Sequence, residues 1–255
     1  MIIVAWNVRG MNSPIKTKEV KNFLAENKVS VVGLMETKIK ESNAQKIQKK
    51  FGNKWSWCTN YNHHVNGRVW VGWRKDRCKI EICDTHQQFV AVKITPINST
   101  VGFYTVFVYG LHNVRDRRDL WKELGKIDYN ASCLYIGDFN AIFKDEHRKN
   151  GAQVTTYETY DMLHWLDTKE LHPITEKGHK YSWSNREEGD NRTLTKIDHA
   201  IGNLHWMSNF SHASVHYANP QTSDHTPLIL NLRKHDQTQS AVSYTHLTLP
   251  TKRIV

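Results

Sequence analysis

The chain has 255 residues, a net charge of +10 at pH 7 and a sequence isoelectric point near 9.4. With 39% hydrophobic residues and nine tryptophans, it is too apolar for a disordered chain, and no apolar run reaches the roughly 20 residues of a membrane span. We therefore expect one soluble, intracellular globular domain without a targeting signal. The positive charge favours a polyanionic partner, nucleic acid before an acidic membrane surface.

The first predicted elements are a strand, a helix and a second strand. Residues 2–8 have the composition of a strand, with Asn7 near its end, and residues 29–35 form another apolar strand that Glu36 follows. Between them, Ser13 and Pro14 are typical of a helix N-terminus. The helix continues to residue 27, and its expected buried positions are Ile15, Val20, Phe23 and Leu24. A polar side chain thus ends each strand, as at the edge of a sheet where sites collect.

Strands and helices alternate less regularly in the middle of the chain. It is predicted to form a short basic helix, five strands and a second helix, over residues 42–50, 55–61, 69–73, 79–84, 89–95, 101–109 and 114–127. Asn66-Gly67 predicts a hairpin between the first two of these strands, with Arg68 at its tip. The consecutive strands indicate antiparallel pairing, and Tyr109 is again a polar residue at a strand end.

One short stretch carries the strongest signal. Residues 133–136 are apolar, as in a strand covered on both faces, and Gly137-Asp138-Phe139-Asn140 follows directly. Because side chains alternate along an extended chain, Asp138 and Asn140 are expected on one face and Phe139 in the core. Taken alone, this pattern also fits an ordinary strand-to-loop turn.

The last third of the domain contains a helix and three strands. They are predicted over residues 157–168, 179–184, 194–201 and 226–232. The expected apolar positions of the helix are Tyr160, Leu163, Trp165 and Leu166. Asp198 lies in an apolar strand, and Asp224-His225 precedes the last strand. A buried acid needs a partner, so a histidine from another segment would explain Asp198.

Residues 1–235 are expected to be the domain and residues 236–255 a disordered tail. Residues 242–255 have no acidic residue, and they resemble a translated sequencing adaptor, which indicates an artefact. Without Lys252 and Arg253 the net charge of residues 1–240 is still +8.

The cysteines and the remaining histidines give no site. The cysteines contain no C-x-x-C pair and are expected to be reduced core thiols; they are Cys58, Cys78, Cys83 and Cys133. Four histidines are expected on the surface or in loops, namely His63, His64, His147 and His179.

The polar residues at strand ends suit metal-assisted phosphodiester hydrolysis. Glu36 with Asn7 offers the oxygen ligands that Mg²⁺ prefers. Asp138 could deprotonate water, and an Asp-oriented His225 could stabilise charge on phosphate oxygens. Tyr109 and Asn140 are hydrogen-bond donors for the same group. Each residue alone also has an ordinary structural explanation, such as capping a turn.

Five segments in order resemble the endonuclease/exonuclease/phosphatase superfamily. They are Trp6-Asn7-Val8-Arg9-Gly10, Met35-Glu36-Thr37-Lys38, Gly137-Asp138-Phe139-Asn140, Lys196-Ile197-Asp198-His199 and Ser223-Asp224-His225-Thr226-Pro227-Leu228. Tyr181-Ser182-Trp183-Ser184-Asn185 is most similar to the endonuclease domain of LINE-type non-LTR retrotransposons, particularly the plant lineages. The resemblance implies a four-layer αββα sandwich, of α/β (α+β) class, with two mixed, mainly antiparallel sheets flanked by helices.

The resemblance also implies a role for each site residue. Metal ligands would be Glu36, Asn7 and Asp224; catalytic residues would be Asp138, Asn140, His225, Asp198 and Tyr109; DNA contacts would come from Arg9, Ser182, Arg68 and Asn185. The cofactor would be Mg²⁺, with Mn²⁺ as a substitute. Arg9 departs from abasic-site repair nucleases, which have aspartate there, and this argues against a repair role and against a second metal.

The implied function is a metal-dependent endonuclease that nicks double-stranded DNA and leaves a 3′-hydroxyl, which primes reverse transcription in such elements. The partners would be target DNA and a reverse-transcriptase domain of the same polyprotein, absent from this chain, with no membrane. Nuclear access follows from the substrate alone. Two alternatives stay open: a phosphatase or phosphodiesterase of the same superfamily, and an inert nucleic-acid-binding remnant.

Overall fold

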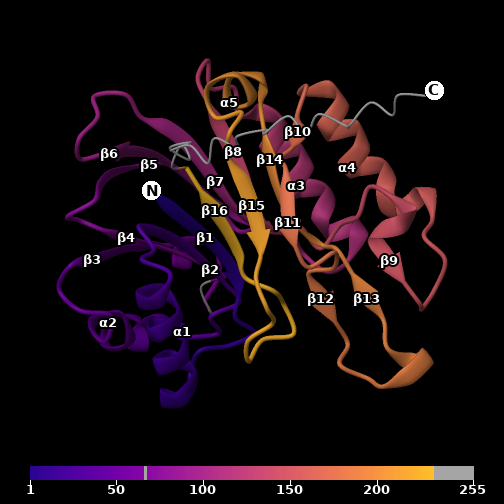
Figure 1. Ribbon diagram of the computed structural model, residues 1–255, viewed down its shortest axis with the longest axis horizontal. Helices are drawn as coiled ribbons and strands as arrows, with labels where there is room; N and C mark the ends of the chain where they lie inside the picture. The colour runs from indigo at the N-terminus through magenta and orange to yellow at the C-terminus, as the bar shows by residue number, and fades with distance from the viewer. Residues whose placement is uncertain (66–67, 233–255) are drawn as a thin grey trace, which may run out of the picture.

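Two β-sheets pack face to face between two pairs of helices in the computed structural model, which describes residues 1–65 and 68–232 (Figure 1). The seven-stranded sheet has the order β11 (Glu176–Gly178), β15 (Ser214–Tyr217), β16 (Leu228–Asn231), β1 (Ile2–Asn7), β2 (Val31–Met35), β4 (Val69–Arg74) and β3 (Trp55–Thr59). The six-stranded sheet has the order β10 (His172–Pro173), β14 (Asp198–Gly202), β8 (Cys133–Asp138), β7 (Phe103–Tyr109), β6 (Phe89–Pro96) and β5 (Cys78–His86).

Five α-helices accompany these sheets within the described residues. They are α1 (Pro14–Glu26), α2 (Glu41–Lys49), α3 (Val114–Lys126), α4 (Thr156–Thr168) and α5 (Leu204–Asn209). Ser13 caps α1 as expected, because its side chain accepts a hydrogen bond from the Lys16 amide. None of these helices has the length and apolar character needed to cross a membrane.

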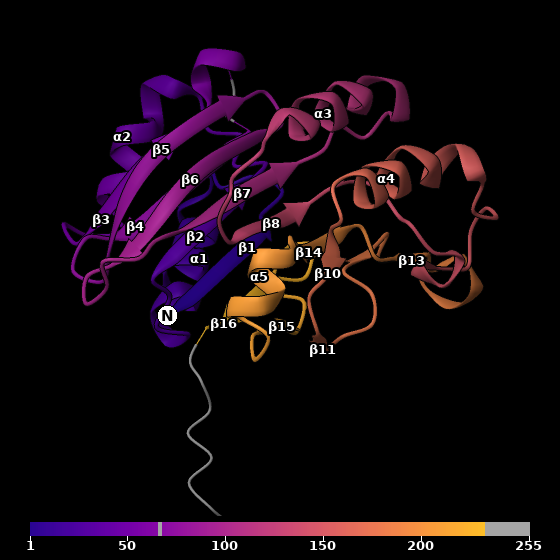
Figure 2. The ribbon, with the colours of Figure 1, turned by 90° about the horizontal axis from the view of Figure 1, so that it is seen from above.

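Three apolar cores explain the layers. Val20, Phe23 and Leu24 of α1 pack with Trp6 and Trp70 on the outer face of the seven-stranded sheet. The outer face of the six-stranded sheet packs against α3 and α4 through Leu120, Leu124, Met162, Trp165 and Leu166. The third core, which includes Phe107, Ile136 and Val215, lies between the sheets. Figure 2 shows α1 and α2 on one side and α3 and α4 on the other. The predicted four-layer αββα sandwich is confirmed.

Most strand pairs are antiparallel, as predicted. The parallel pairs among the described strands are β1 with β2, β7 with β8, and β11 with β15. A small third sheet, β12 (Trp183–Ser184), β13 (Leu194–Thr195) and β9 (Arg148–Lys149), was not predicted.

The strands predicted over residues 179–184 and 194–201 differ from those in the structure. Residues 194–201 form two strands, because β13 pairs with β9 and the chain then crosses to pair β14 with β8. The Lys196 amide donates to the His147 carbonyl at this crossing. Of residues 179–184 only β12 is a strand, since β11 ends before them at Gly178.

Several predicted core positions lie at the surface. Ile15 is 72% exposed in α1, and Tyr160 and Leu163 of α4 are 65% and 45% exposed, because Thr159 and Met162 occupy the buried stripe instead. Cys83 is exposed, while the other three cysteines are buried and all four are free. Conversely His147, expected in a surface loop, is buried. Asn66-Gly67 and the predicted tail lie outside the described residues.

Candidate active site

Three predicted site residues meet across adjacent strands of the six-stranded sheet. Tyr109 at the end of β7 is opposite Asp138 at the end of β8, and Asp138 is opposite Asp198 at the start of β14. Asn7 ends β1 of the other sheet, paired with Met35 directly before Glu36. The site therefore lies at one end of the sandwich, where both sheets contribute side chains, as predicted.

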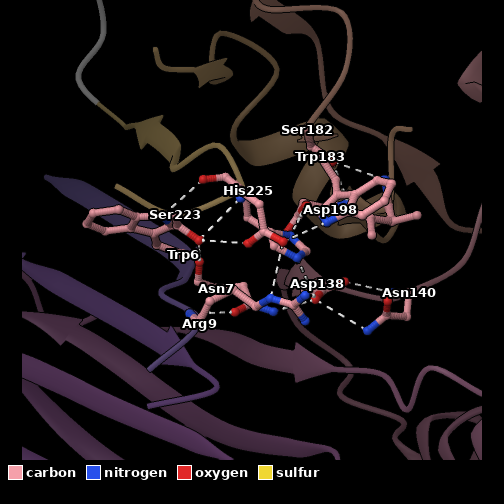
Figure 3. A network of polar contacts seen from close by, with 12 residues as sticks. Trp6, Asn7, Arg9, Asp138, Asn140, Ser182, Trp183, Asp198, Ser223 and His225 are labelled. Carbon is pink, nitrogen blue, oxygen red and sulfur yellow. Dashed lines mark hydrogen bonds and ion pairs between the residues drawn. The ribbon is translucent and has the colours of Figure 1, made fainter. Parts of the chain in front are cut away.

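Asp138, His225 and Asp198 form a buried chain of an acid, an imidazole and a second acid (Figure 3). His225 Nδ1 lies 2.9 Å from Asp198 Oδ2, and its Nε2 lies 3.8 Å from Asp138 Oδ2. Burial of Asp138, reinforced by the Asp198 charge, raises the pKa of the Asp138 carboxyl. Burial alone would lower the pKa of His225, but the two carboxylates outweigh it and raise that pKa. The arrangement favours an imidazolium between two acids.

Ser223 and Trp6, to which the sequence motifs assigned no role, hold His225 in place. Ser223 Oγ donates to the Asn7 carbonyl over 2.6 Å and accepts the His225 amide at 3.2 Å. Trp6 Nε1 donates to the His225 carbonyl. The loop before β16 is thus fastened to β1. Ser223 stands in a Ser-Asp-His motif of the sequence, but the motif alone does not predict its hydrogen bonds to Asn7 and His225.

Asn7 lies between the two acids of the site, and its role as a metal ligand stays a prediction. Its Nδ2 lies 2.8 Å from Asp138 Oδ2 and 3.4 Å from Glu36 Oε1, while its Oδ1 accepts the Arg9 amide. Through this amide nitrogen Asn7 connects Glu36 with Asp138.

Glu36 is the acid that faces the pocket with several cationic and polar donors around it. Tyr109 Oη donates to Glu36 Oε1 over 2.8 Å, Arg9 Nη1 lies 3.4 Å from the same oxygen, and Lys38 Nζ lies 3.2 Å from Oε2. Burial would raise the pKa of Glu36, but Tyr109 and the two cations lower it. The carboxylate is therefore ionised and surrounded by positive charge in the position where a divalent cation was predicted.

Arg9 bridges two partly buried acids of the site, Glu36 and Asp224. Its Nε lies 3.2 Å from Asp224 Oδ2, while its Nη1 contacts Glu36, so the guanidinium separates the two predicted metal ligands. Asp224 Oδ2 also accepts from Trp183 Nε1 at 3.0 Å. Arg9 has a left-handed backbone, with φ 49°, which turns the chain sharply after β1. Asp224 is thus held by Arg9 and Trp183, and its role as a metal ligand stays a prediction.

Ser182, for which a DNA contact was predicted, lies inside the fold. It is fully buried, and its Oγ accepts the backbone amides of Ile197 and Asp198, each at 3.0 Å. Its carbonyl accepts the Thr226 amide next to His225. Ser182 thus fixes the segments that carry Asp198 and His225, and its contact with DNA stays a prediction.

Asn140, Asn185 and Arg68 have contacts that the sequence did not predict. Asn140 lies beside Asp138 because of a left-handed backbone, φ 48°, rather than strand alternation, and its Nδ2 donates to Gly110 O and to Asp138 Oδ2. Asn185 accepts two backbone amides within its own loop. The Arg68 guanidinium lies 6.0 Å from the centre of the Tyr109 ring, and its contact with DNA stays a prediction.

A pocket of about 570 Å³ opens over these residues. Its lining includes Glu36, Tyr109, Asn140 and His225 of the site, together with Arg148, Gly151 and Thr193. Trp183 and Ile197 form part of its apolar wall. Asp138 and Asp198 are buried and are not among the residues that line this pocket.

Two positions fit a metal ion by the chemistry of their donors. The atoms of Asp138, Asp198 and His225 lie within 4.8 Å of one another, which makes them one candidate group. The other is Glu36, whose carboxylate borders the pocket. Mg²⁺ prefers oxygen ligands and keeps several waters, whereas both nitrogens of His225 already face carboxylates. The pocket-facing Glu36 therefore suits Mg²⁺ better than the buried group.

The comparisons with known proteins agree with this geometry. The family described as "Endonuclease/Exonuclease/phosphatase family" matches residues 4–225. Among solved structures, the chain resembles the endonuclease domain of TRAS1, a telomere-specific non-LTR retrotransposon (TM-score 0.64, 13% identity, 92% of this chain and 99% of that one). It also resembles the AP endonuclease LMAP from Leishmania major (0.64, 15%, 91% and 87%) and an endonuclease/exonuclease/phosphatase from Bacteroides vulgatus (0.59, 14%, 91% and 98%). At these identities the structural likeness shows the fold alone.

Proposed function

Because the chain belongs to the endonuclease/exonuclease/phosphatase family, we propose that it is a Mg²⁺-dependent endonuclease that nicks double-stranded DNA. The observation that carries this proposal is the buried Asp138–His225–Asp198 chain next to the Glu36 carboxylate. These groups are a base, an oriented imidazolium and a ligand for a hard cation, which together suit hydrolysis of a phosphodiester.

Each group has a defined task in the proposed reaction. Asp138 accepts a proton from the attacking water, whose oxygen bonds to phosphorus as the bond to the 3′-oxygen breaks. His225, held by Asp198, donates to a phosphate oxygen and stabilises its charge. Glu36 would hold the Mg²⁺ ion, which would supply Lewis-acid stabilisation of the phosphate. The leaving 3′-oxygen takes a proton from solvent water, so the products are a 5′-phosphate and a 3′-hydroxyl.

The charge of the chain and its motifs support DNA as the substrate. The net charge of +8 over residues 1–240 gives affinity for a phosphate backbone. Tyr181-Ser182-Trp183-Ser184-Asn185 and the Lys-Ile-Asp-His segment resemble retrotransposon endonucleases, so we assign the nick to target-primed reverse transcription. In that setting the 3′-hydroxyl primes a reverse-transcriptase domain of the same polyprotein. Mn²⁺ is expected to replace Mg²⁺.

Conversion of supercoiled plasmid to open circle tests this function. Residues 1–240 should nick the plasmid with Mg²⁺ but not with chelator, and Asp138→Ala should lower the rate by at least about 100-fold because the base is lost. DNA binding, measured in chelator, should change little in this variant. Absence of nicking by folded wild-type protein, combined with turnover of a soluble inositol phosphate, would instead identify a phosphatase.

Metal binding distinguishes the two candidate positions. Mg²⁺ should raise the melting temperature of the wild type, and the Mg²⁺ concentration that gives half of this rise is the midpoint. Glu36→Gln should raise the midpoint by at least about tenfold, because it removes the ligand. Asp198→Asn should leave the midpoint near the wild-type value, since Asp198 is assigned to His225. The reverse pattern would place the ion in the buried group instead.

A further inference from the structure

Lys16 and Arg186 meet at one backbone carbonyl beside the site. Lys16 Nζ lies 3.5 Å from the Thr222 carbonyl oxygen, and Arg186 Nη2 donates to the same oxygen over 2.9 Å. Lys16 is in the first turn of α1, and Arg186 is in the loop after β12. Figure 1 shows α1, the β15–β16 loop and the β12–β13 hairpin at the same end of the molecule. Three segments that are distant in sequence thus converge on Thr222.

These two cations have no carboxylate of their own. Within residues 1–65 and 68–232, neither Lys16 nor Arg186 takes part in a salt bridge. Asp224 attracts Lys16, but its carboxylate is already engaged by Arg9 and Trp183. A single neutral carbonyl is shared between two positive charges.

The arrangement is costly without an anion. Burial and repulsion from Arg186 and Lys38 lower the pKa of Lys16, while Asp224 and Glu19 oppose this. A neutral donor would hold the Thr222 carbonyl equally well without the repulsion. The backbone of Arg186 is also left-handed, with φ 61°, which aims this loop back across the β15–β16 loop. Two converging cations with one weak acceptor form the electrostatic setting that a phosphate satisfies.

We propose that Lys16 and Arg186 form a clamp for a non-scissile phosphate of the DNA backbone. The proposal rests on the proposed function and adds the direction in which the strand leaves the site. Thr222 is three residues before His225, so their Cα atoms are at most about 11 Å apart. With about 3.4 Å of rise per nucleotide, the clamped phosphate is within about three nucleotides of the scissile one. The strand therefore runs from the Asp138–His225 centre toward α1.

The salt dependence of DNA binding tests the clamp. Binding of a short duplex, measured in chelator across a salt series, gives the slope of log affinity against log salt. Lys16→Ala and Arg186→Ala should each weaken binding, and the double variant should reduce the slope by about 0.9 because one phosphate contact is lost. Lys16→Arg should keep the wild-type slope, since the charge remains.

The matched control is Lys18→Ala. Lys18 is exposed on the same helix, two residues from Lys16 and thus about 200° around its axis, and should leave the slope unchanged. Duplexes in which one phosphate at a time is replaced by a neutral methylphosphonate locate the contact. Replacement at one position within about three nucleotides of the nick should weaken binding by the wild type but not by the double variant. An unchanged slope in the double variant, with wild-type plasmid nicking intact, overturns the clamp alone. Absence of DNA binding by wild-type protein overturns both proposals.

Discussion

The buried hydroxyl of Ser182 holds the backbone segments that carry two proposed catalytic residues, although it contacts neither of their side chains. It accepts the amides of Ile197 and Asp198 from inside the fold, and the same residue bonds through its main chain to Thr195 and Thr226. Asp198 and His225 come from segments 27 residues apart, and Ser182 joins both. Its function is therefore one of positioning.

Ser182→Ala should destabilise the protein by about 1–3 kcal/mol, because two buried amides lose their acceptor. Unfolding in urea measures this loss. The nicking rate should fall as Asp198 loses its fixed orientation, while duplex affinity in chelator stays near the wild-type value. Unchanged stability with weaker DNA binding would contradict the positioning role and support the DNA contact that the sequence suggested.

At the scale of elements, β8 reaches the site through an unusual residue. Gly137 has φ 143°, and a Cβ built on it would lie 2.2 Å from the Val108 carbonyl oxygen and 2.5 Å from Met35 Cε. Neighbouring β7 and a side chain of the facing sheet therefore leave no space there. This close approach brings Asp138 under the other sheet, within reach of Asn7.

Gly137→Ala should cost about 1–3 kcal/mol or more in the free energy of unfolding, because both the backbone conformation and the space require glycine. Gly125→Ala is the matched control, since Gly125 is in helix α3 with open space around its Cβ direction and should gain about 0.5–1 kcal/mol. Urea unfolding of both variants gives the signs. A stable Gly137→Ala protein would show that β8 can shift, in which case nicking should report the displacement of Asp138.

The sequence predicted the strongly patterned elements and the strand ends that meet at the site. Apolar runs such as β8 and capped helices such as α1 carry local signals, and Asp138, Asp198 and His225 were placed by motifs. The sequence did not predict the split between β13 and β14, because each half is satisfied by a different partner strand. It also missed the orientation of Asn7 and the burial of Ser182, since both depend on hydrogen bonds across segments distant in sequence.

For the whole molecule, two buried histidines link the stability of the fold to pH. Burial lowers the pKa of His199 to about 3 and that of His147 to about 4, with neighbouring positive charge acting in the same direction. Their rings lie 5.5 Å apart, and His199 Nε2 contacts the Ala141 carbonyl. Both histidines are neutral in the folded protein at pH values where the unfolded chain already binds protons.

The sign of the pH effect follows from this difference. Below about pH 6.5 the unfolded chain takes up protons at these positions and the folded protein does not, so stability falls as the pH decreases toward about 4. At pH 5 each histidine should cost about 2 kcal/mol relative to pH 7.5. His199→Gln keeps a donor for the Ala141 carbonyl and removes one titrating group. Its stability should therefore fall by about 2 kcal/mol less than that of the wild type over this range.

Urea unfolding at pH 7.5 and pH 5.0, in chelator, measures the difference directly. Comparing variant with wild type cancels the contributions of other groups such as His225, whose raised pKa acts in the opposite direction. His205→Gln, an exposed histidine, is the control and should follow the wild type. Equal losses for His199→Gln and wild type would mean that the buried pair opens and protonates before the fold unfolds, because only local opening lets the folded protein bind the same protons as the unfolded chain.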